Sequence, residues 1–300
     1  MNDAILPSVI EISGLSRKFG DKLVLNQVSL QVPRGRVFGL VGANGAGKTT
    51  LIKHILGLLK AESGSVRVLG FDPVADPVAV LSRTGFLSEN RDLPPWMRVD
   101  ELLRYTRSFY PRWDSGYAEE LRRQFGLEGT TKIKHLSRGE NAKAGLLLAL
   151  AFRPDLLLLD EPSSGLDPLV RRDILEAIIR TVADEGRTVF FSTHLMDEVE
   201  RVADDIAMMF DGRVALEGSL EEIKRDHHRL VLRFDAPPAA VPKVPGVLSI
   251  AGSGREWTVI CNGSRPEAVA AMARLGGRVV AEETPSLDEI FVARAGGKIA

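Results

Sequence analysis

Residues 42–49 read Gly-Ala-Asn-Gly-Ala-Gly-Lys-Thr, and residues 156–162 read Leu-Leu-Leu-Leu-Asp-Glu-Pro. In the first stretch the glycines allow successive backbone N–H groups to point inward and bind phosphate oxygens. Lys48 adds a compact positive charge for the β and γ phosphates, and the hydroxyl of Thr49 is a ligand for Mg²⁺. A strand before the loop and a helical pattern after it complete the context that a phosphate-binding loop requires.

The second stretch ends an apolar strand with two carboxylates. Asp160 is a candidate Mg²⁺ ligand, and Glu161 is placed to orient an attacking water and take its proton. His194 follows the next apolar strand by two residues. Because the carboxyl ends of parallel strands meet at one edge of a sheet, we expect His194 to contact the γ-phosphate, with a purely structural histidine as the alternative.

Composition narrows the classes of function. The chain has 300 residues, of which 44% are hydrophobic, enough for one large domain or two. With 39 basic and 40 acidic side chains the net charge is −1, so nucleic acid is not an expected partner. A single cysteine, Cys261, excludes an internal disulfide and fits a reduced cytosolic setting, in which it fills space within a strand.

No segment of the sequence predicts a membrane anchor. Met1–Pro7 lacks the charged and apolar regions of a signal peptide. No window approaches the roughly 20 apolar residues that a membrane span needs. We therefore expect a soluble chain whose membrane role, if any, depends on a partner.

The periodicity of apolar residues changes at about Ser219. Before it, strands alternate with helices, which predicts an α/β sheet with ligands at the carboxyl ends of the strands. After it, short strands and helices surround a proline-rich loop, which predicts a small α+β accessory domain. Asp114 and Ser115 are candidate caps of the helix predicted at 117–125, and Asp167 is the cap of a helix that begins at Pro168. The predicted strands are 9–12, 25–32, 36–41, 156–159, 188–192, 230–234, 247–251, 256–261 and 278–281, and the predicted helices are 49–59, 99–110, 117–125, 137–152, 168–185, 196–203, 220–224, 266–275 and 286–293.

The segment Leu136–Glu140 allows two interpretations. Ser137 and Glu140 have the spacing of a capping box, which would simply begin a helix. A serine-capped helix N-terminus that continues with Gly139 is also an anion site, able to meet a phosphate from outside. The sequence by itself supports both interpretations equally.

The order and spacing of these motifs resemble the ATP-binding cassette of ABC transporters, over about Val9–Ser219. The resemblance implies a P-loop NTPase fold with a RecA-like sheet core and a helical signature subdomain at 98–152. The cassette would occupy 1–218 and the accessory domain 219–300. ATP would be held by the Walker A loop, by the signature motif of a second chain and by an aromatic stacked on adenine. The residues that correspond are Phe19, Gly42, Asn44, Gly45, Ala46, Gly47, Lys48, Thr49, Thr50, Ser137, Gly139 and Asp167.

The resemblance also implies roles for the catalytic residues. Asp160 and Glu161 correspond to Walker B and the catalytic glutamate, His194 to the switch histidine and 164–167 to the D-loop. Lys48 would act with Glu161 and His194 on ATP, and Mg²⁺ would be held by Thr49, Asp160 and Glu89. For Phe19, an ordinary apolar residue near a turn is the alternative.

In the same family two cassettes pair head to tail, so we expect a homodimer that drives a separate transmembrane permease from the cytoplasmic face of the cell membrane. Two departures stand out. Arg138 and Glu140 replace the usual glycine and glutamine of the signature, and Glu89 replaces a glutamine that senses Mg²⁺ and the membrane domain. Leu93, Trp96 and Met97 either line the groove for the permease or belong to the core.

The stretch Tyr110–Asp114 and the tail resemble export-type cassettes, whose ATPase and permease are separate chains. The main alternative is a soluble ABC-type ATPase acting on ribosomes or another assembly, but that branch carries two cassettes in one chain. The spacing of Lys48 and Asp160 leaves no room for the coiled coil of chromosome ATPases. A non-catalytic regulator is disfavoured because Lys48, Asp160, Glu161 and His194 are all present.

Overall fold

The computed structural model describes residues 8–183, 186–237, 246–263, 265–274 and 276–296. The chain divides into two compact units, Met1–Glu217 and Gly218–Ala300, whereas the sequence pattern placed the change at 218–219. The expectations for Met1–Pro7 and for the prolines at 238, 242 and 245 lie outside the described residues. Within the described residues no helix combines the length and the apolar character needed to cross a membrane.

A six-stranded sheet forms the centre of the first unit, in the order β5-β6-β7-β3-β8-β9. β3 pairs in parallel with β7 and β8, and β6 pairs in parallel with β5 and β7. Every residue of β3, β6 and β7 is buried, as expected for parallel strands covered on both faces. The strands are β3 (Val37–Gly42), β5 (Thr84–Leu87), β6 (Leu156–Asp160), β7 (Thr188–Thr193), β8 (Asp205–Phe210) and β9 (Arg213–Ser219).

The register of this sheet brings the motifs together. Asp160 pairs with Ser192, and Val41 with Thr193, so β3, β6 and β7 all end at one edge. The phosphate loop follows β3 there. The prediction that distant motifs share the carboxyl edge of a parallel sheet is thus confirmed.

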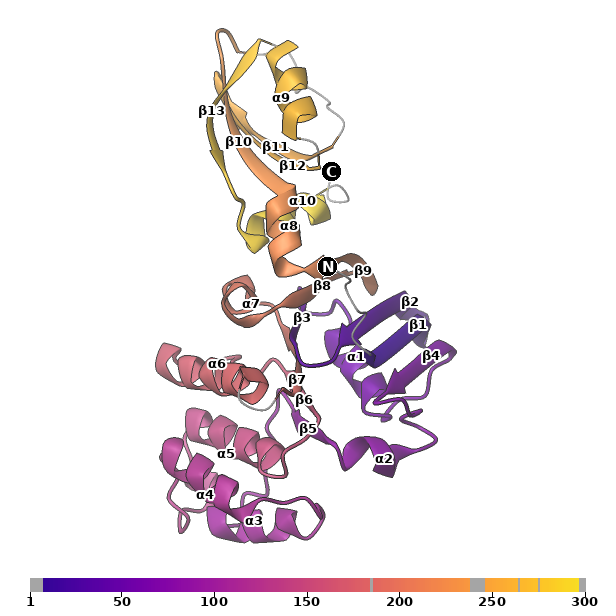
Figure 1. Cartoon of the computed structure of the whole chain (residues 1–300), viewed down its shortest axis with the longest axis vertical. Helices are drawn as coiled ribbons and strands as arrows, with labels where there is room; N and C mark the ends of the chain where they lie inside the picture. Colours follow the sequence, from indigo (N-terminus) through magenta and orange to yellow (C-terminus); the bar gives the residue numbers. More distant parts are fainter. Residues whose placement is uncertain (1–7, 184–185, 238–245, 264, 275, 297–300) are drawn as a thin grey trace. The chain divides into compact units, whose positions relative to one another are not determined.

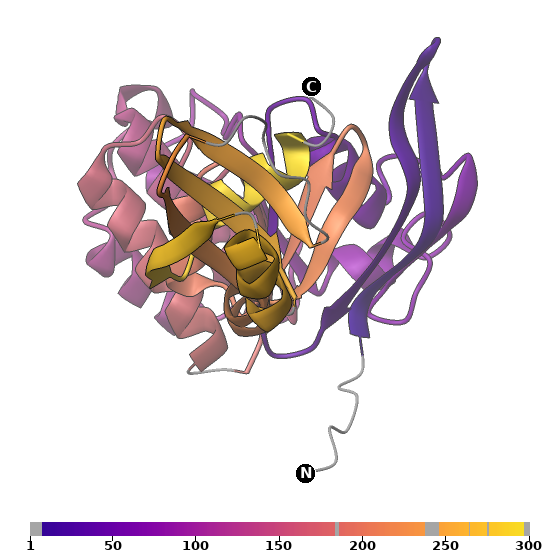
Figure 2. The same cartoon turned by 90° about the horizontal axis from the view of Figure 1, so that it is seen from above.

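A second, antiparallel sheet in the order β2-β1-β4 lies across α1 from the parallel one (Figure 1). Figure 2 shows β1 and β2 as a long twisted pair. One core cluster includes Ile10, Leu30, Leu51 and Phe190, and so joins both sheets to α1. The elements are β1 (Ser8–Phe19), β2 (Lys22–Pro33), β4 (Ser63–Val68) and α1 (Lys48–Ile55).

Helices complete the first unit. α6 and α7 contact β3 and β7, while α3, α4 and α5 gather at one end of the unit (Figure 1). α3 ends before Tyr110, whose ring instead stacks on Phe152 at 3.9 Å, so the predicted end of that helix was too late. The helices are α2 (Pro77–Leu81), α3 (Val99–Arg107), α4 (Ser115–Gln124), α5 (Arg138–Leu150), α6 (Pro168–Ala183) and α7 (Met196–Val202).

In the described residues of the second unit, an antiparallel sheet in the order β11-β12-β10-β13 is accompanied by the helices α8, α9 and α10. Its core contains Leu230, Leu232, Val259 and Met272. Cys261 is buried in β12, which confirms its interpretation as a filler within a strand. The elements are α8 (Leu220–Asp226), β10 (His227–Phe234), β11 (Val247–Ser253), β12 (Glu256–Asn262), α9 (Arg265–Arg274), β13 (Gly277–Glu283) and α10 (Leu287–Gly296).

Candidate functional site

The phosphate loop connects β3 to α1 through two glycines with left-handed backbones. Gly45 and Gly47 have φ angles of 84° and 106°. A Cβ atom at Gly47 would lie 2.9 Å from the carbonyl oxygen of Val24, so a side chain there would also push the loop away from β2. Glycine is thus required for conformation and for space, and the loop leads directly into the N-terminus of α1, where phosphate is favoured.

Lys48 is buried within the loop that it ends. Its Nζ donates to the carbonyl oxygen of Gly42 over 2.6 Å and forms an ion pair of 3.0 Å with Oε1 of Glu161. Only 5% of the residue is exposed. An ammonium group held by a carbonyl and a carboxylate can exchange either partner for a phosphate oxygen, since all three are hydrogen-bond acceptors.

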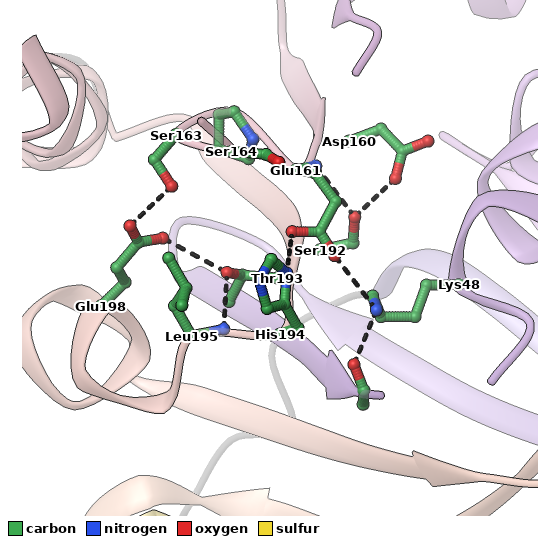
Figure 3. A network of polar contacts seen from close by, with 12 residues as sticks. Lys48, Asp160, Glu161, Ser163, Ser164, Ser192, Thr193, His194, Leu195 and Glu198 are labelled. Atoms are coloured by element: carbon green, nitrogen blue, oxygen red, sulfur yellow. Dashed lines mark hydrogen bonds and ion pairs between the residues drawn. The ribbon is translucent and has the colours of Figure 1, made fainter. Parts of the chain in front are cut away.

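Glu161 is the centre of the site, as Figure 3 shows. It is 5% exposed and has a φ of 48°, a conformation that costs a non-glycine residue on the order of 1–3 kcal/mol. Its backbone N–H donates to the backbone oxygen and to Oγ of Ser192, at 3.1 and 3.2 Å. Nδ1 of His194 donates to Oε2 over 2.8 Å. The structure therefore brings the predicted base, the predicted switch histidine and Lys48 into direct contact.

Ser192 links the two acidic residues of the site. Its Oγ donates to Oδ1 of Asp160 over 2.6 Å while accepting the N–H of Glu161. Sequence reasoning missed this residue. The available signal was a hydroxyl side chain directly after the apolar run 189–191, two positions before His194.

A cavity of about 330 Å³ opens over the loop. Sequence reasoning missed Lys22 and Val24, which reach the cavity because the antiparallel sheet carries β2 past the phosphate loop. Gly42, Ala46, Asp160 and His194 do not line it, and neither do Phe19, Ser137, Gly139 and Asp167. Its lining residues are Lys22, Val24, Asn44, Gly45, Gly47, Lys48, Thr49, Thr50, Glu89 and Glu161.

The capping box of α5 is confirmed. Oγ of Ser137 accepts the N–H of Glu140 over 3.2 Å, and Oε2 of Glu140 accepts the N–H of Ser137 over 2.7 Å. That second hydrogen bond lowers the pKa of the Glu140 carboxyl. Gly139 also has a packing role, because a Cβ atom there would lie 2.8 Å from Cγ2 of Val170 in α6.

The turn at 162–167 is held by two arginines. A Cβ atom on Gly165 would lie 2.4 Å from the guanidinium carbon of Arg138, so this departure from the usual signature contacts the D-loop of its own chain. Arg91 is 7% exposed and donates from one nitrogen to the carbonyl oxygens of Pro162 (2.9 Å) and Ser164 (3.2 Å). Burial, and then the charge of Arg138, lowers the pKa of Arg91. Sequence reasoning missed Arg91, although it follows Glu89 by two residues.

The predicted roles of Phe19, Asp167 and Trp96 are tested only in part by their positions in the structure. Phe19 is 46% exposed at the end of β1, with the guanidinium carbon of Arg17 4.8 Å from its ring centre, and its stacking on adenine stays a prediction. Asp167 caps α6 by accepting the N–H groups of residues 169 and 170, which confirms the predicted cap but does not test a role in binding ATP. Trp96 is 69% exposed, so core packing is the wrong interpretation for this residue.

The oxygen-bearing side chains near the loop fit Mg²⁺. Thr49 and Glu89 line the cavity, and Asp160 ends β6 with one carboxylate oxygen bonded to Ser192. The described part of the chain has no cluster of three or more His, Cys, Asp or Glu side chains suited to a metal. Mg²⁺ is commonly bound by one or two carboxylates together with the phosphates of a substrate.

Known proteins resemble this chain over most of its length. The family model described as ABC transporter matches residues 25–164. The ABC transporter ATP-binding protein YtrB of Bacillus subtilis is 29% identical over 97% of this chain and 99% of its own. The daunorubicin resistance ATP-binding protein DrrA3 of Streptomyces coeruleorubidus is 31% identical, covering 95% of both chains. The Nod factor export ATP-binding protein I of Rhizobium sp. (strain N33) is 32% identical over 96% of this chain and 97% of its own.

Solved structures give the same picture of the fold. The ATP-binding subunit of an ABC transporter superimposes with a TM-score of 0.67 and 31% identity, over 73% of this chain and 92% of that one. A dimeric bacterial ABC transporter cassette, 24% identical, superimposes with a TM-score of 0.63 over 70% of this chain and 98% of that one. The P-loop NTPase cassette fold expected from the sequence is thereby confirmed.

Proposed function

This chain belongs to the family of ABC transporter ATP-binding proteins, and we propose that it drives export as one half of a cassette dimer that closes on ATP. Family membership makes it an ATP-binding transporter subunit and an ATPase. The alternative, a soluble ATPase acting on ribosomes, is not favoured by the relatives that match this chain over nearly its whole length. They are named as ATP-binding proteins of an ABC transporter, of daunorubicin resistance and of Nod factor export.

The observation that carries the mechanism is the contact of Lys48 and His194 with the two carboxylate oxygens of Glu161. When the phosphates of ATP enter the loop, Lys48 would exchange Glu161 for phosphate oxygens. Glu161 would then be free to orient a water and accept its proton, while His194 would remain beside it to contact the γ-phosphate.

Mg²⁺, when bound, would neutralise charge between the phosphates and would be held by Thr49, Asp160 and Glu89. Asp160 suits this role because Ser192 fixes its orientation over 2.6 Å. The backbone amides of the loop and the start of α1 would hold the phosphates, and Phe19 would stack on adenine.

The position of Ser137 and Gly139 outside the lining of the cavity supports a composite site. In a head-to-tail homodimer these residues would meet the ATP held by the loop of the second chain. The N-terminus of α5 favours an anion there. Each such site would need ATP on the loop of one chain and the N-terminus of α5 from the other.

The segment around Trp96 is connected to the N-terminus of α5 within the first unit. Trp96 is exposed, and the segment around it is bonded to the residues before Ser137, since the carbonyl oxygens of Pro95 and Met97 accept the N–H groups of Lys134 and Ile133 at 3.2 and 2.9 Å. We propose that Leu93, Trp96 and Met97 receive the permease. Movement at this segment would then reach the signature helix.

The export direction rests on the named functions of two relatives, Nod factor export and daunorubicin resistance. The relatives' names as ATP-binding proteins support a permease on a separate chain. We propose that the subunit acts at the cytoplasmic face of the cell membrane, where ATP is available and where the permease would hold it.

The test is affinity capture of a tagged Glu161→Gln chain from gently solubilised native membranes with Mg-ATP, followed by mass spectrometry. We expect one polytopic membrane protein to be enriched over a capture with the exposed control Glu176→Gln. The Trp96→Ala chain should lose that protein, whereas Phe109→Ala, which also removes an exposed aromatic ring, should retain it. Recovery of ribosomal proteins, or of the cassette alone, would contradict the transporter assignment for this chain.

A further inference from the structure

Glu198 is a buried carboxylate that the mechanism above does not use. It lies in the first turn of α7 and is 0% exposed. Oε1 accepts a hydrogen bond of 2.5 Å from Oγ of Ser163, and Oε2 accepts one of 3.2 Å from Oγ1 of Thr193. Nε of Arg171 lies 3.3 Å from Oε1. A buried charge is strongly unfavourable unless it is compensated in this way. The four side chains therefore form one cluster of hydrogen bonds and an ion pair.

The two hydroxyl groups stand beside the reactive residues. Ser163 follows Glu161 by two positions, and Thr193 immediately precedes His194. Thr193 also accepts the N–H of Leu195 over 3.0 Å, so the hydroxyl holds the chain on both sides of His194. Figure 3 shows Glu198 reaching both segments from the side opposite Lys48.

The contacts of Glu198 offset part of the cost of its burial. Burial raises the pKa of the carboxyl, and the hydrogen bond from Ser163 and the charge of Arg171 oppose that effect. In surroundings without water, hydrogen bonds to a carboxylate are shorter and stronger than those between neutral groups.

We propose that Glu198 is a positioning residue for ATP hydrolysis, holding the turn after Glu161 and the strand end before His194 in a fixed relation. The proposal rests on the function proposed above. Glu198 touches neither substrate nor metal in this role. It fixes the 2.8 Å contact between Glu161 and His194 by fixing the backbone on each side of it.

The substitution Glu198→Gln tests this in the full-length chain. The amide retains the volume, but it can accept a hydrogen bond with only one of its two terminal atoms, so one anchor is lost. We expect kcat to fall about tenfold to a hundredfold, as for other changes that misplace reacting groups, with the Kd for ATP changed less than about twofold. The control is Asp197→Asn, an exposed neighbour with the same loss of charge, which should keep the wild-type rate.

A second pair of variants covers the case in which Glu198→Gln does not fold. Thr193→Val keeps the shape of the side chain and removes the hydroxyl, whereas Thr193→Ser keeps the hydroxyl. We expect Thr193→Val to lower kcat at unchanged Kd and Thr193→Ser to retain it. Equal rates for both variants would overturn the proposal.

A substitution of Arg171 distinguishes a positioning role of Glu198 from that of a merely structural ion pair. Glu198→Gln leaves its guanidinium without the carboxylate, and adding Arg171→Gln removes that unpaired charge. We expect the double variant to regain thermal stability but not kcat. The proposal would be overturned if the double variant recovered kcat together with stability, or if Glu198→Gln itself had the wild-type rate. A wild-type chain without ATPase activity would instead contradict the proposed function.

Discussion

Glu161 is buried, has a strained backbone and contacts the nitrogen atoms of two side chains through its carboxylate. Its carboxylate lies between the ammonium of Lys48 and the imidazole of His194, and Ser192 holds its N–H. Strain of this kind persists only where the surroundings fix it, and such residues concentrate at functional sites. In the absence of phosphate the candidate base is therefore held by the lysine that binds the substrate. Entry of phosphate and release of the base become one event.

Glu161→Gln should abolish turnover while leaving ATP binding intact. The amide cannot accept the proton of the attacking water, a loss that corresponds to about 10²–10⁴ in kcat. Binding persists because Lys48 keeps its carbonyl partner and its charge. The measurement is single-turnover hydrolysis together with equilibrium binding of ATP.

The matched control is Glu176→Gln, which makes the same chemical change on an exposed face of α6. It should hydrolyse ATP at the wild-type rate. Undiminished hydrolysis by Glu161→Gln would remove this residue from the role of base.

At the scale of elements, the N-terminus of α5 shows how one local pattern can serve two purposes. The capping box between Ser137 and Glu140 is present, yet Gly139 must also be small because α6 packs against it. Arg138 at the first helical position places positive charge where the helix dipole disfavours it. Its contact with Gly165 links the signature helix to the D-loop within one chain.

Substitutions at Ser137 can separate capping from phosphate binding. Ser137→Ala removes the cap and should cost about 1 kcal/mol of stability. Ser137→Asp keeps the cap and suits the helix dipole, so stability should be retained. Its negative charge should nevertheless prevent ATP-driven dimerisation in the Glu161→Gln background, measured by light scattering.

Ser219 provides the matched control, because it also caps a helix, α8, by accepting the N–H of Glu222. Ser219→Asp should be as stable as Ser137→Asp and should still dimerise with ATP. If Ser137→Asp also dimerises normally, the serine is only a cap.

Local sequence predicted elements well where burial or capping is decided by neighbours along the chain. The four leucines of β6 and the caps at Asp114, Ser137 and Asp167 are examples. The prediction omitted the strands β4, β5, β8 and β9 and the short helix α2. β4 has only two buried residues among six. β8 is stabilised as a strand by its pairing with β3, in which Val41 and Met208 are partners 167 residues apart (208 − 41). The periodicity of apolar residues along the sequence does not predict a partner strand so far away.

At the scale of the whole molecule, the chain consists of two units with separate cores. Two predictions belong to this scale. One concerns how two chains assemble around ATP. The other concerns how the stability of the chain depends on pH, since each unit buries a histidine.

Head-to-tail assembly predicts complementation between two inactive variants. Lys48→Ala removes the side chain that would bind phosphate in the chain's own loop. Ser137→Asp places a negative charge where the chain would contact the ATP bound to its partner. In the Glu161→Gln background neither variant should dimerise with ATP alone. A mixture should form heterodimers, because one of the two composite sites then has both intact halves. Light scattering on differently tagged chains measures this, and absence of heterodimers in the mixture would contradict the arrangement.

The stability of the second unit should decrease in acid. His227 is buried, with Nδ1–H donating to the carbonyl oxygen of Ile223 over 2.6 Å and Nε2 accepting from Arg294 over 3.1 Å. Burial lowers its pKa below the usual 6.5. The unfolded chain then binds a proton more readily than the folded one, so stability is complete above the unfolded pKa and is lost as the pH falls below it.

Thermal unfolding on both sides of that pH tests the sign. The midpoint should fall in acid, and it should fall less in His227→Gln, whose amide can make both hydrogen bonds without titrating. His54 in the first unit contributes in the same direction, because burial lowers its pKa too. The exposed control His135→Gln should keep the wild-type dependence, and an unchanged dependence in His227→Gln would contradict the assignment.

The chemistry of this protein follows from short stretches of its sequence. The order of residues 42–49, Asp160, Glu161 and His194 specified a nucleotide site, because each motif depends on residues adjacent in the chain. Which of these groups are in contact depends on the folded chain. It paired Lys48 with Glu161, brought Arg91 and Glu198 to the same turn, and placed Lys22 and Val24 at the cavity. These contacts follow from strand order and sheet packing, which act between residues far apart in sequence. The periodicity of apolar residues along the chain therefore does not predict them.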